Sequence, residues 1–374
     1  MTLHNKNILS GLFLFFLLLT SCGEKEQDIT PPSVSDDVEF SFTISTRTPT
    51  DPEFLEENAK YFQAGKSTIL LSQRSGSIGL DFHEGSVNCY KYVFNPPEDP
   101  GSINWDQGFN FSSSKPMNWE RIRATGIFGN GYSFGALYFP GENTYIEEVR
   151  SDQSDGEVFK DCDILGAHHF TSNESERLAF QFNHLMCKMH VDLYIPVYNE
   201  ERNDGFDLDE VRATGIQFRT DFTINFGDFG QEYPPIAQTD NSVAGKVSDI
   251  SMYLCSEPED VKLSGDQLKN YDIYQLEEDE VKKYSFEMLF PQQTVSTGDI
   301  LRFTLKRGDS EYNYTFRLDY ASQNVGDFKF EPGKINQLDL YLPRSANEVV
   351  LFRAFMNDWK ESSAEFTITE EKQQ

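Results

Sequence analysis

Histidines and cysteines are the residues of this chain that could bind a metal ion, and most of them gather in one stretch. That stretch contains Cys162, His168, His169, His184, Cys187 and His190. In one regular strand His184 and His190 would share a face but lie roughly 20 Å apart, at about 3.3 Å per residue, with Cys187 on the opposite face. The chain has no CxxC or HExxH motif. The spacing favours structural roles, and we expect neither a metal site nor a cofactor.

No group of residues indicates an enzyme. The 61 Asp and Glu residues are too numerous for one pair to stand out as a general acid and base. The chain lacks a GxSxG nucleophile elbow and a GxxxxGK phosphate loop. The glycines of "GIFGNG", residues 126–131, are better explained by a hairpin turn. We therefore expect a protein that is not an enzyme.

Trp105 is a candidate ligand contact. It lies in the aromatic loop "NPPEDPGSINWDQGFNF", where an indole ring could stack on a sugar. A tryptophan in a loop of a β protein also commonly packs against its own loop. The sequence leaves both roles open.

The charge and the cysteines indicate the compartment. A formal charge of −29 and a pI near 4.5 argue against nucleic-acid binding, which needs a basic surface. An acidic surface fits a protein that is soluble outside the cell. Four cysteines of the main chain could form two disulfides there or remain buried thiols: Cys89, Cys162, Cys187 and Cys255.

The first 21 residues have the pattern of an export signal. Lys6 precedes the apolar run "ILSGLFLFFLLL", which is shorter than the roughly 20 residues of a membrane-spanning helix. The run ends in Leu-Thr-Ser-Cys, which resembles the bacterial lipobox. That resemblance implies cleavage before Cys22 and a diacylglycerol on its thiol, which would attach the protein to the outer membrane. Residues 22–37 are polar and acidic and fit an unfolded tether.

Beyond the tether, the chain is typical of a mainly β protein. It has 32 Phe and 17 Tyr, and period-two stretches recur. We expect two β-sandwich domains, residues 38–173 and 174–374, because about 325 residues exceed one sandwich. Strands are expected in "SIGLDFH", "YSFGALYF", "MHVDLYI", "GIQFRTDFTINF", "YSFEMLF", "LRFTLKR", "YNYTFRLDY", "NQLDLYL", "VVLFRAF" and "AEFTITE". The acidic segment 256–283 is expected to hold a short helix or a long excursion.

Two further patterns make specific predictions. In "RLAFQFNHLMCKMHVDLYIP" the apolar alternation changes phase after Phe182, which predicts a β-bulge or strand break near Asn183 and His184. The pentapeptide "RATGI" occurs at 123–127 and again at 212–216. Either an internal duplication or coincidence would explain it.

The first strand after the tether is unusually regular. "VEFSFTISTR", residues 38–47, alternates apolar and polar side chains and stops at Arg47, followed by Thr48 and Pro49. Its apolar positions are Val38, Phe40, Phe42 and Ile44. On its own, the pattern also fits a plain edge strand ending in a solvent-facing arginine.

These motifs together resemble the fimbrillin family, the lipoprotein-precursor pilus subunits of Gram-negative gut and oral bacteria. The likeness runs from Val38 to the C-terminus. Its motifs are "FTISTR", "YSFGALYFP", "DILGAHH", the Phe-x-His-x-Leu-x-Lys-like "FNHLMCK" at 182–188, "FEPGKINQLDLYL" and "FMNDWKES". The cysteine content and the acidic segment 256–283 depart from the family pattern and leave stalk, tip and anchor positions open.

The resemblance implies two tandem transthyretin-like β-sandwiches and assembly by donor-strand exchange. The strand 38–46 would fill a groove of the N-terminal domain through Val38, Phe40, Phe42 and Ile44. An arginine-specific protease would cut between Arg47 and Thr48, and a C-terminal strand of the next pilus subunit, 349–355 or 364–370, would replace the removed strand. The expected location is the outer membrane and the fimbrium at the cell surface, in a role in adhesion.

A second function remains open. The chain could be a monomeric surface lipoprotein, anchored through Cys22, that binds a glycan or host protein through loops such as the one with Trp105.

Overall fold

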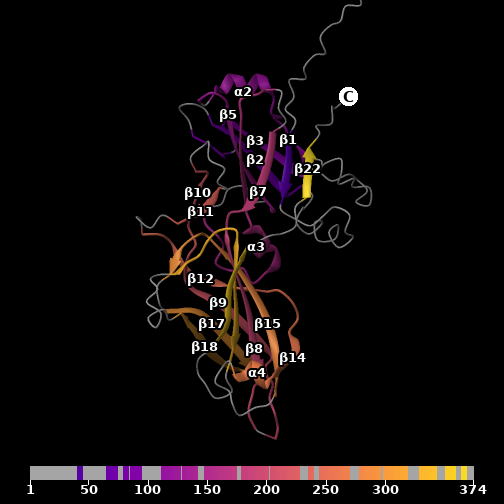
Figure 1. Cartoon of the computed structure of the whole chain (residues 1–374), viewed down its shortest axis with the longest axis vertical. Helices are drawn as coiled ribbons and strands as arrows, with labels where there is room; N and C mark the ends of the chain where they lie inside the picture. The colour runs from indigo at the N-terminus through magenta and orange to yellow at the C-terminus, as the bar shows by residue number, and fades with distance from the viewer. Residues whose placement is uncertain are drawn as a thin grey trace, which may run out of the picture. The chain divides into compact units, whose positions relative to one another are not determined.

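The computed structural model describes residues 40–44, 65–74, 79–83, 85–94, 111–127, 129–141, 147–174, 178–201, 203–227, 235–239, 244–269, 278–295, 298–318, 328–342, 350–358 and 364–368, all in one compact unit, Asp36–Gln374. Strands dominate this part of the chain (Figure 1). The described helices are short: α2 (Trp119–Thr125), α3 (Gly156–Asp161) and α4 (Gly265–Lys269). The expected all-β class is confirmed.

The N-terminal strands join in one eight-stranded sheet. Its order is β22 (Ala364–Ile368), β1 (Phe40–Ile44), β7 (Leu178–His184), β6 (Leu165–Thr171), β5 (Tyr132–Phe139), β2 (Thr68–Arg74), β3 (Cys89–Phe94), β4 (Phe111–Ser112). β6 and β7 share only the pairs Leu165↔His184 and Gly166↔Asn183. β7 therefore leaves β6 beyond these pairs and continues along β1.

Both faces of the centre of this sheet are covered, because every residue of β5 is buried. One face forms a core with α2 and β7 that includes Tyr90, Tyr92, Trp119, Ile122, Phe134, Leu178, Phe180 and Phe182. The opposite face packs in a second cluster that includes Leu70, Leu137, Phe139, Phe222 and Leu289.

The strand break predicted near Asn183 and His184 is confirmed, directly after these residues. β7 ends at His184 and β8 (Cys187–Pro196) begins three residues later, in a different sheet. Leu185 and Met186 between them are fully buried. β7 follows residue 173, where we expected the second domain to begin, and yet it pairs with β6 and β1. The change of sheet falls at Leu185 and Met186.

The C-terminal strands form two sheets around a common core. One has the order β12 (Val247–Ser251), β9 (Glu210–Arg219), β17 (Gly298–Arg307), β18 (Ser310–Leu318). The other has the order β13 (Tyr253–Leu254), β15 (Glu278–Phe290), β8, β20 (Lys334–Tyr341), β21 (Val350–Asp358), and β14 (Glu259–Ser264) also pairs with β15. Apolar residues of both sheets, among them Val191, Phe286, Leu301 and Phe303, form the core.

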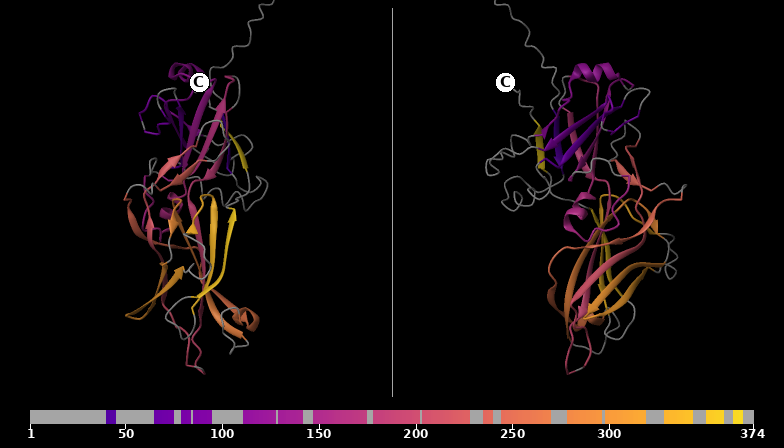
Figure 2. Two further views of the ribbon diagram at one scale, coloured as in Figure 1. Left: turned by 60° about the vertical axis from the view of Figure 1, so that its left-hand side comes forward. Right: turned by 180° about the vertical axis from the view of Figure 1, so that it is seen from behind.

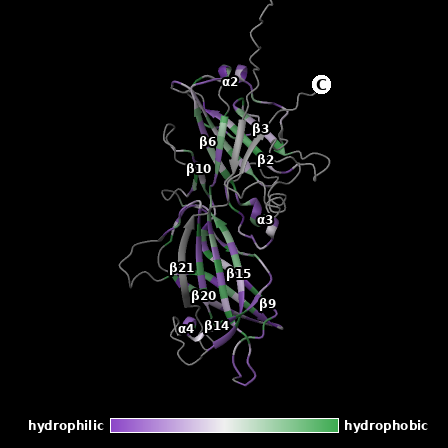
Figure 3. Ribbon diagram, turned by 45° about the vertical axis from the view of Figure 1, so that its right-hand side comes forward, coloured by the Kyte–Doolittle hydropathy of each residue, from purple (hydrophilic) through white to green (hydrophobic). Residues whose placement is uncertain are grey.

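Small strand pairs complete the described part of the chain. β10 (Thr223–Asn225) pairs with β11 (Ile236–Gln238), and β16 (Thr294–Val295) pairs with β19 (Phe328–Lys329). Figure 2 gives two further views of the same arrangement. Along β15 both hydrophobic and hydrophilic colours appear (Figure 3), as expected for a strand with one face on a core.

Three expectations about elements were wrong or incomplete. Residues 79–83 of "SIGLDFH" are not in a strand. The segment "GIQFRTDFTINF" is two strands, β9 and β10, in different sheets. The turn "GIFGNG" lies between α2 and β5, so it does not close a β-hairpin. The acidic segment does contain a short helix, α4, next to β14 and the start of β15.

The two "RATGI" copies have different conformations. Residues 123–125 end helix α2, whereas residues 212–216 lie within strand β9. Gly126 caps the helix with φ of 101°, but Gly215 is paired with Leu301 in a sheet. An internal duplication would place the copies in equivalent elements, so coincidence is the better explanation.

Candidate functional site

The strand expected to be removable lies inside the N-terminal sheet. β1 pairs in parallel with β7 on one side and antiparallel with β22 on the other. Figure 1 shows β1 between these two strands, next to the yellow β22. Segments from the two ends of the chain are thus adjacent in one sheet.

The register of β1 relates it to the N-terminal core. Phe40 pairs with Leu178, Phe42 with Phe180 and Ile44 with Phe182. These three β7 side chains are at most 1% exposed and belong to the core that contains α2. The apolar positions of β1 therefore stand at the register positions of core residues in its parallel neighbour.

Without β1, the adjacent edge of β7 would present unpaired backbone donors and acceptors. Such an edge is satisfied when another extended segment adds to it. Removal of β1 would also take away the strand with which β22 pairs in this sheet.

Several predicted site residues lie outside the described residues. These are Cys22, Val38, Arg47, Thr48 and Trp105. Their roles stay predictions.

The residues of the histidine- and cysteine-containing stretch 162–190 do not form a common cluster, among the residues that the structure describes. His184 Nδ1 lies 2.7 Å from Asp163 Oδ1, and this histidine is buried. His168 and His169 lie on β6, and His190 is in the other sandwich, on β8. None of Cys89, Cys162, Cys187 and Cys255 forms a disulfide. Burial raises the pKa of Cys162 to about 11, which keeps this thiol protonated and unreactive.

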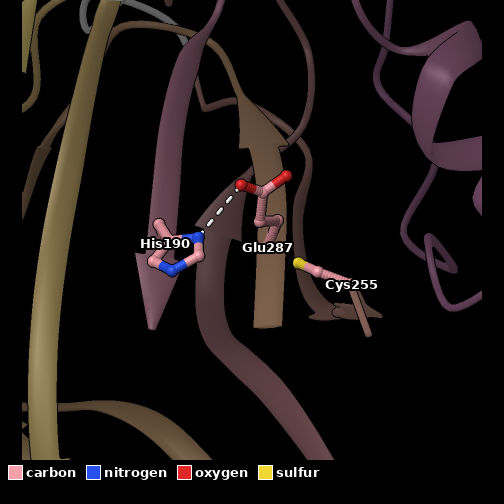
Figure 4. A group of neighbouring side chains, drawn as sticks. All are labelled: His190, Cys255 and Glu287. Atoms are coloured by element: carbon pink, nitrogen blue, oxygen red, sulfur yellow. Dashed lines mark hydrogen bonds and ion pairs between the residues drawn. The ribbon is translucent and has the colours of Figure 1, made fainter. Parts of the chain in front are cut away.

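A mixed cluster on two neighbouring strands and the residue that follows a third was not expected from the sequence. It contains His190 of β8, Glu287 of β15 and Cys255, which follows β13 (Figure 4). Glu287 is the register partner of His190 on one side and of Tyr253 on the other. The Cys255 amide donates to the Ser285 carbonyl at 2.9 Å, which holds Cys255 beside β15.

Charged neighbours surround the imidazole of this cluster. His190 Nδ1 lies 3.0 Å from Glu287 Oε1, and its Nε2 lies 3.3 Å from Asp192 Oδ1. Burial lowers the pKa of His190, but hydrogen bonds with Asp192, Cys255 and Glu287 outweigh burial and raise it to about 11. Lys188 Nζ lies 2.8 Å from the other oxygen of Glu287.

Sequence spacing gave no signal for this cluster. Glu287 follows His190 by 97 residues, and only the order of strands in the sheet brings them together. Alternation along "MHVDLYI" does place His190 and Asp192 on the face opposite to Met189 and Val191. It does not identify what lies across from them.

A pocket of about 450 Å³ lies on the face of β5 that carries Leu137 and Phe139, the face that packs in the second cluster. Its lining is mainly apolar, with Leu80, Phe82, Leu137, Phe139, Phe222 and Phe226, and Arg74, Asp81, His83 and Glu147 also contribute. Phe82 and Phe226 stack at 5.3 Å between centroids. Across the described ranges, helices are too short or too polar to cross a membrane.

A comparison with family models confirms the resemblance that the motifs indicate. A family model described as fimbrillin-like matches residues 106–359. No curated protein matches the chain. A cell adhesion protein from Bacteroides uniformis is 15% identical, with a TM-score of 0.45 over 86% of this chain and 97% of that one. A cell adhesion protein from Bacteroides ovatus is 11% identical, with a TM-score of 0.46 over 90% of this chain and 99% of that one. The tip fimbrial protein Mfa3 from Porphyromonas gingivalis is 10% identical, with a TM-score of 0.32 over 86% of this chain and 100% of that one.

Proposed function

The chain belongs to the fimbrillin-like family, and from this premise we propose that it is a structural or accessory subunit of an adhesive fimbrium at the cell surface. A subunit in this role assembles with other pilus subunits. The role needs no enzymatic activity. We further propose that the subunit is exported as an outer-membrane lipoprotein through Cys22 and assembles by donor-strand exchange. An arginine-specific protease that cuts after Arg47 would start the exchange.

The observation that carries this proposal is the double pairing of β1. Its five residues are paired with β7 on one side and with β22 on the other. Only a short segment before Arg47 would therefore have to leave. While β1 is covalently attached, its high effective concentration keeps it in the sheet, and cleavage removes that advantage.

β22 is the better donor candidate of the two C-terminal strands. β21 pairs with β20 and is the last strand of a C-terminal sheet. Among the strands that the structure describes, β22 pairs with β1 and with none of the C-terminal sheets. A segment that already pairs outside its own sandwich can be transferred to another subunit without opening that sandwich.

The test is cleavage of purified protein with an arginine-specific protease. We expect cut protein to form ladders or fibres, seen by native electrophoresis and electron microscopy. Arg47→Ala and Arg47→Lys should both remain monomeric with that protease, whereas trypsin should still convert Arg47→Lys. Protein that is shown by intact mass to be cut after Arg47, and that stays monomeric, would contradict the proposed assembly.

A second candidate function rests on the pocket beside β5. A monomeric lipoprotein could bind a glycan or an apolar segment of a host protein there, since the pocket combines aromatic rings with charged residues. This function predicts saturable binding that Phe82→Ala weakens and that needs no cleavage. A glycan array and a host-extract binding assay without any Phe82-dependent signal would count against it.

A further inference from the structure

In the C-terminal sheet that contains β13, β15 and β8, the face opposite to the core brings together three side chains of the kinds that bind zinc. His190, Cys255 and Glu287 supply a nitrogen, a sulfur and an oxygen atom, all within 4.8 Å of one another. His190 and Glu287 are register partners on β8 and β15, and the Cys255 amide donates to the Ser285 carbonyl of β15, so the backbone fixes their spacing. Each side chain is partly buried, which limits competing water but leaves a route for an ion.

The distances are close to those of a tetrahedral zinc site. With Zn–N and Zn–O near 2.1 Å and Zn–S near 2.3 Å, ligand atoms lie about 3.4 to 3.8 Å apart. His190 Nδ1 and Glu287 Oε1 are 3.0 Å apart, and the widest separation in the group is at most 4.8 Å. Side-chain rotations that move the thiol by about 1 Å would complete the geometry, with a water as fourth ligand.

The histidine is already oriented as a metal ligand would be. Its Nε2 faces Asp192 Oδ1 at 3.3 Å, which leaves Nδ1 directed at Glu287. Asp192 is buried and accepts a hydrogen bond from Ser285 Oγ at 2.5 Å. A carboxylate that holds the second nitrogen of a metal-binding histidine is a regular feature of zinc sites.

The local charge also suits a divalent cation. The Cys255 thiolate, Glu287 and Asp192 together carry three negative charges in a metal-bound state. Zn²⁺ and Lys188, whose Nζ is 2.8 Å from Glu287 Oε2, would balance them. Lys188 uses the oxygen that faces away from His190, so Oε1 stays available to a metal.

From these contacts we propose that His190, Cys255 and Glu287 form a zinc site that links β8, β15 and the end of β13. Asp192 and Ser285 position the imidazole. A bound zinc would fasten the β13 edge to the centre of its sheet, and the water position makes the site open, unlike a closed site with four protein ligands. It involves neither β1 nor β22, so it is independent of strand exchange.

The test uses purified protein with Cys22→Ser, so that an unlipidated N-terminal thiol cannot bind metal. Chelator-treated protein should bind one equivalent of Zn²⁺ in competition with a chromophoric chelator. Co²⁺ should give the intense visible bands of a tetrahedral site and a near-ultraviolet thiolate charge-transfer band. Thermal unfolding should shift upward with Zn²⁺.

Variants distinguish this site from other ways of binding metal. Cys255→Ser should abolish the cobalt charge-transfer band and weaken zinc binding by more than about tenfold, and Asp192→Asn should weaken it by about 10- to 100-fold. Lys188→Gln should tighten zinc binding, because it removes a positive charge that repels the bound cation. His83→Gln is the matched control, since this exposed histidine also pairs with a carboxylate, Asp81, at 2.7 Å.

Two results would overturn the proposal. One is the absence of stoichiometric zinc binding by folded, chelator-treated protein. The other is binding that Cys255→Ser leaves unchanged, with a cobalt spectrum that lacks the thiolate band. Circular dichroism of Cys255→Ser separates loss of the site from loss of the fold.

Discussion

Gln153 shows how a single side chain can replace a strand partner. It is fully buried, its Nε2 donates to the Leu289 carbonyl at 2.8 Å, and its Oε1 accepts from the Leu289 amide at 2.9 Å. The residue lies between the N-terminal strand β5 and helix α3, whereas Leu289 lies in the C-terminal strand β15. One amide therefore joins segments from the two halves of the chain.

Gln153→Ala should lower the free energy of unfolding by about 2 to 4 kcal/mol, because it leaves both backbone groups of Leu289 buried without partners. Denaturant unfolding measures this loss. Gln181→Ala, at an exposed position in β7, should change stability by less than about 0.5 kcal/mol. Equal effects of the two substitutions would show that the Gln153 contacts contribute nothing.

Asp221 provides a pH-dependent contact. Arg219 donates to both of its carboxylate oxygens, at 3.1 and 2.8 Å, and the Lys246 amide donates at 2.9 Å. The hydrogen bonds from Arg219 lower the pKa of Asp221. The folded state therefore favours the ionised carboxylate.

When the pKa of a carboxyl group is lower in the folded than in the unfolded state, the group stabilises the fold at pH values above its unfolded-state pKa of about 3.9. That stability is lost as the pH falls through the folded-state pKa. Asp221→Asn should cost at most about 1 kcal/mol at pH 7, because the pair is partly solvated. The difference in Tm from the unmodified protein should shrink as the pH drops below about 4. A difference that is as large at pH 3 as at pH 7 would contradict this account.

Among the elements, the break between β7 and β8 was predictable from the sequence. The irregular conformation of residues 79–83, which line the pocket, was not. A change of phase in the alternation requires an interruption, and the chain uses it to pass between sheets. Residues 79–83 also alternate, but both edges of the preceding strand β2 are occupied by β3 and β5. Without a free edge the segment instead lines the pocket beside β5.

Of the site formed by β1 and its neighbours, only β1 itself was predictable from the sequence. The alternation of residues 38–46 predicted the strand, and β1 is found at 40–44. Its contact with β22 joins Phe40 to Ile368, and no local pattern specifies such a distant partner. The two "RATGI" conformations give the same lesson, since neighbours in the fold decide between helix and strand.

Strand exchange at β1 predicts that a covalent lock should stop assembly. Ser41 and Ala179 are paired in the parallel register of β1 and β7, a separation that suits a disulfide. Protein with Ser41→Cys and Ala179→Cys should be cut after Arg47 but remain monomeric until a reductant is added. Each single cysteine variant is the control and should assemble normally. Fibres formed by the oxidised double variant would show that β1 need not leave.

In the molecule as a whole, the formal charge of the full sequence is −29, and a subunit cut after Arg47 stays strongly negative, which opposes association of identical subunits. Salt screens such repulsion, with a Debye length of about 10 Å at 0.1 M. Growth of fibres from cut subunits should therefore be faster at about 300 mM than at about 20 mM NaCl. Cutting must be complete before the salt is changed, so that light scattering reports assembly alone. A rate that falls with salt would indicate attraction between charged surfaces instead.

The central claim is that a C-terminal strand of one subunit replaces β1 of another. Its most direct measurement is photo-cross-linking mass spectrometry of fibres grown from equal amounts of light and isotopically heavy subunits, cut after Arg47 and carrying a photo-reactive residue in place of the exposed Gln181. The account predicts cross-links between the β7 segment 178–184 and the C-terminal segment 364–374, about half of them joining a light to a heavy peptide. Cross-links that join these segments only within one isotopic form would contradict it.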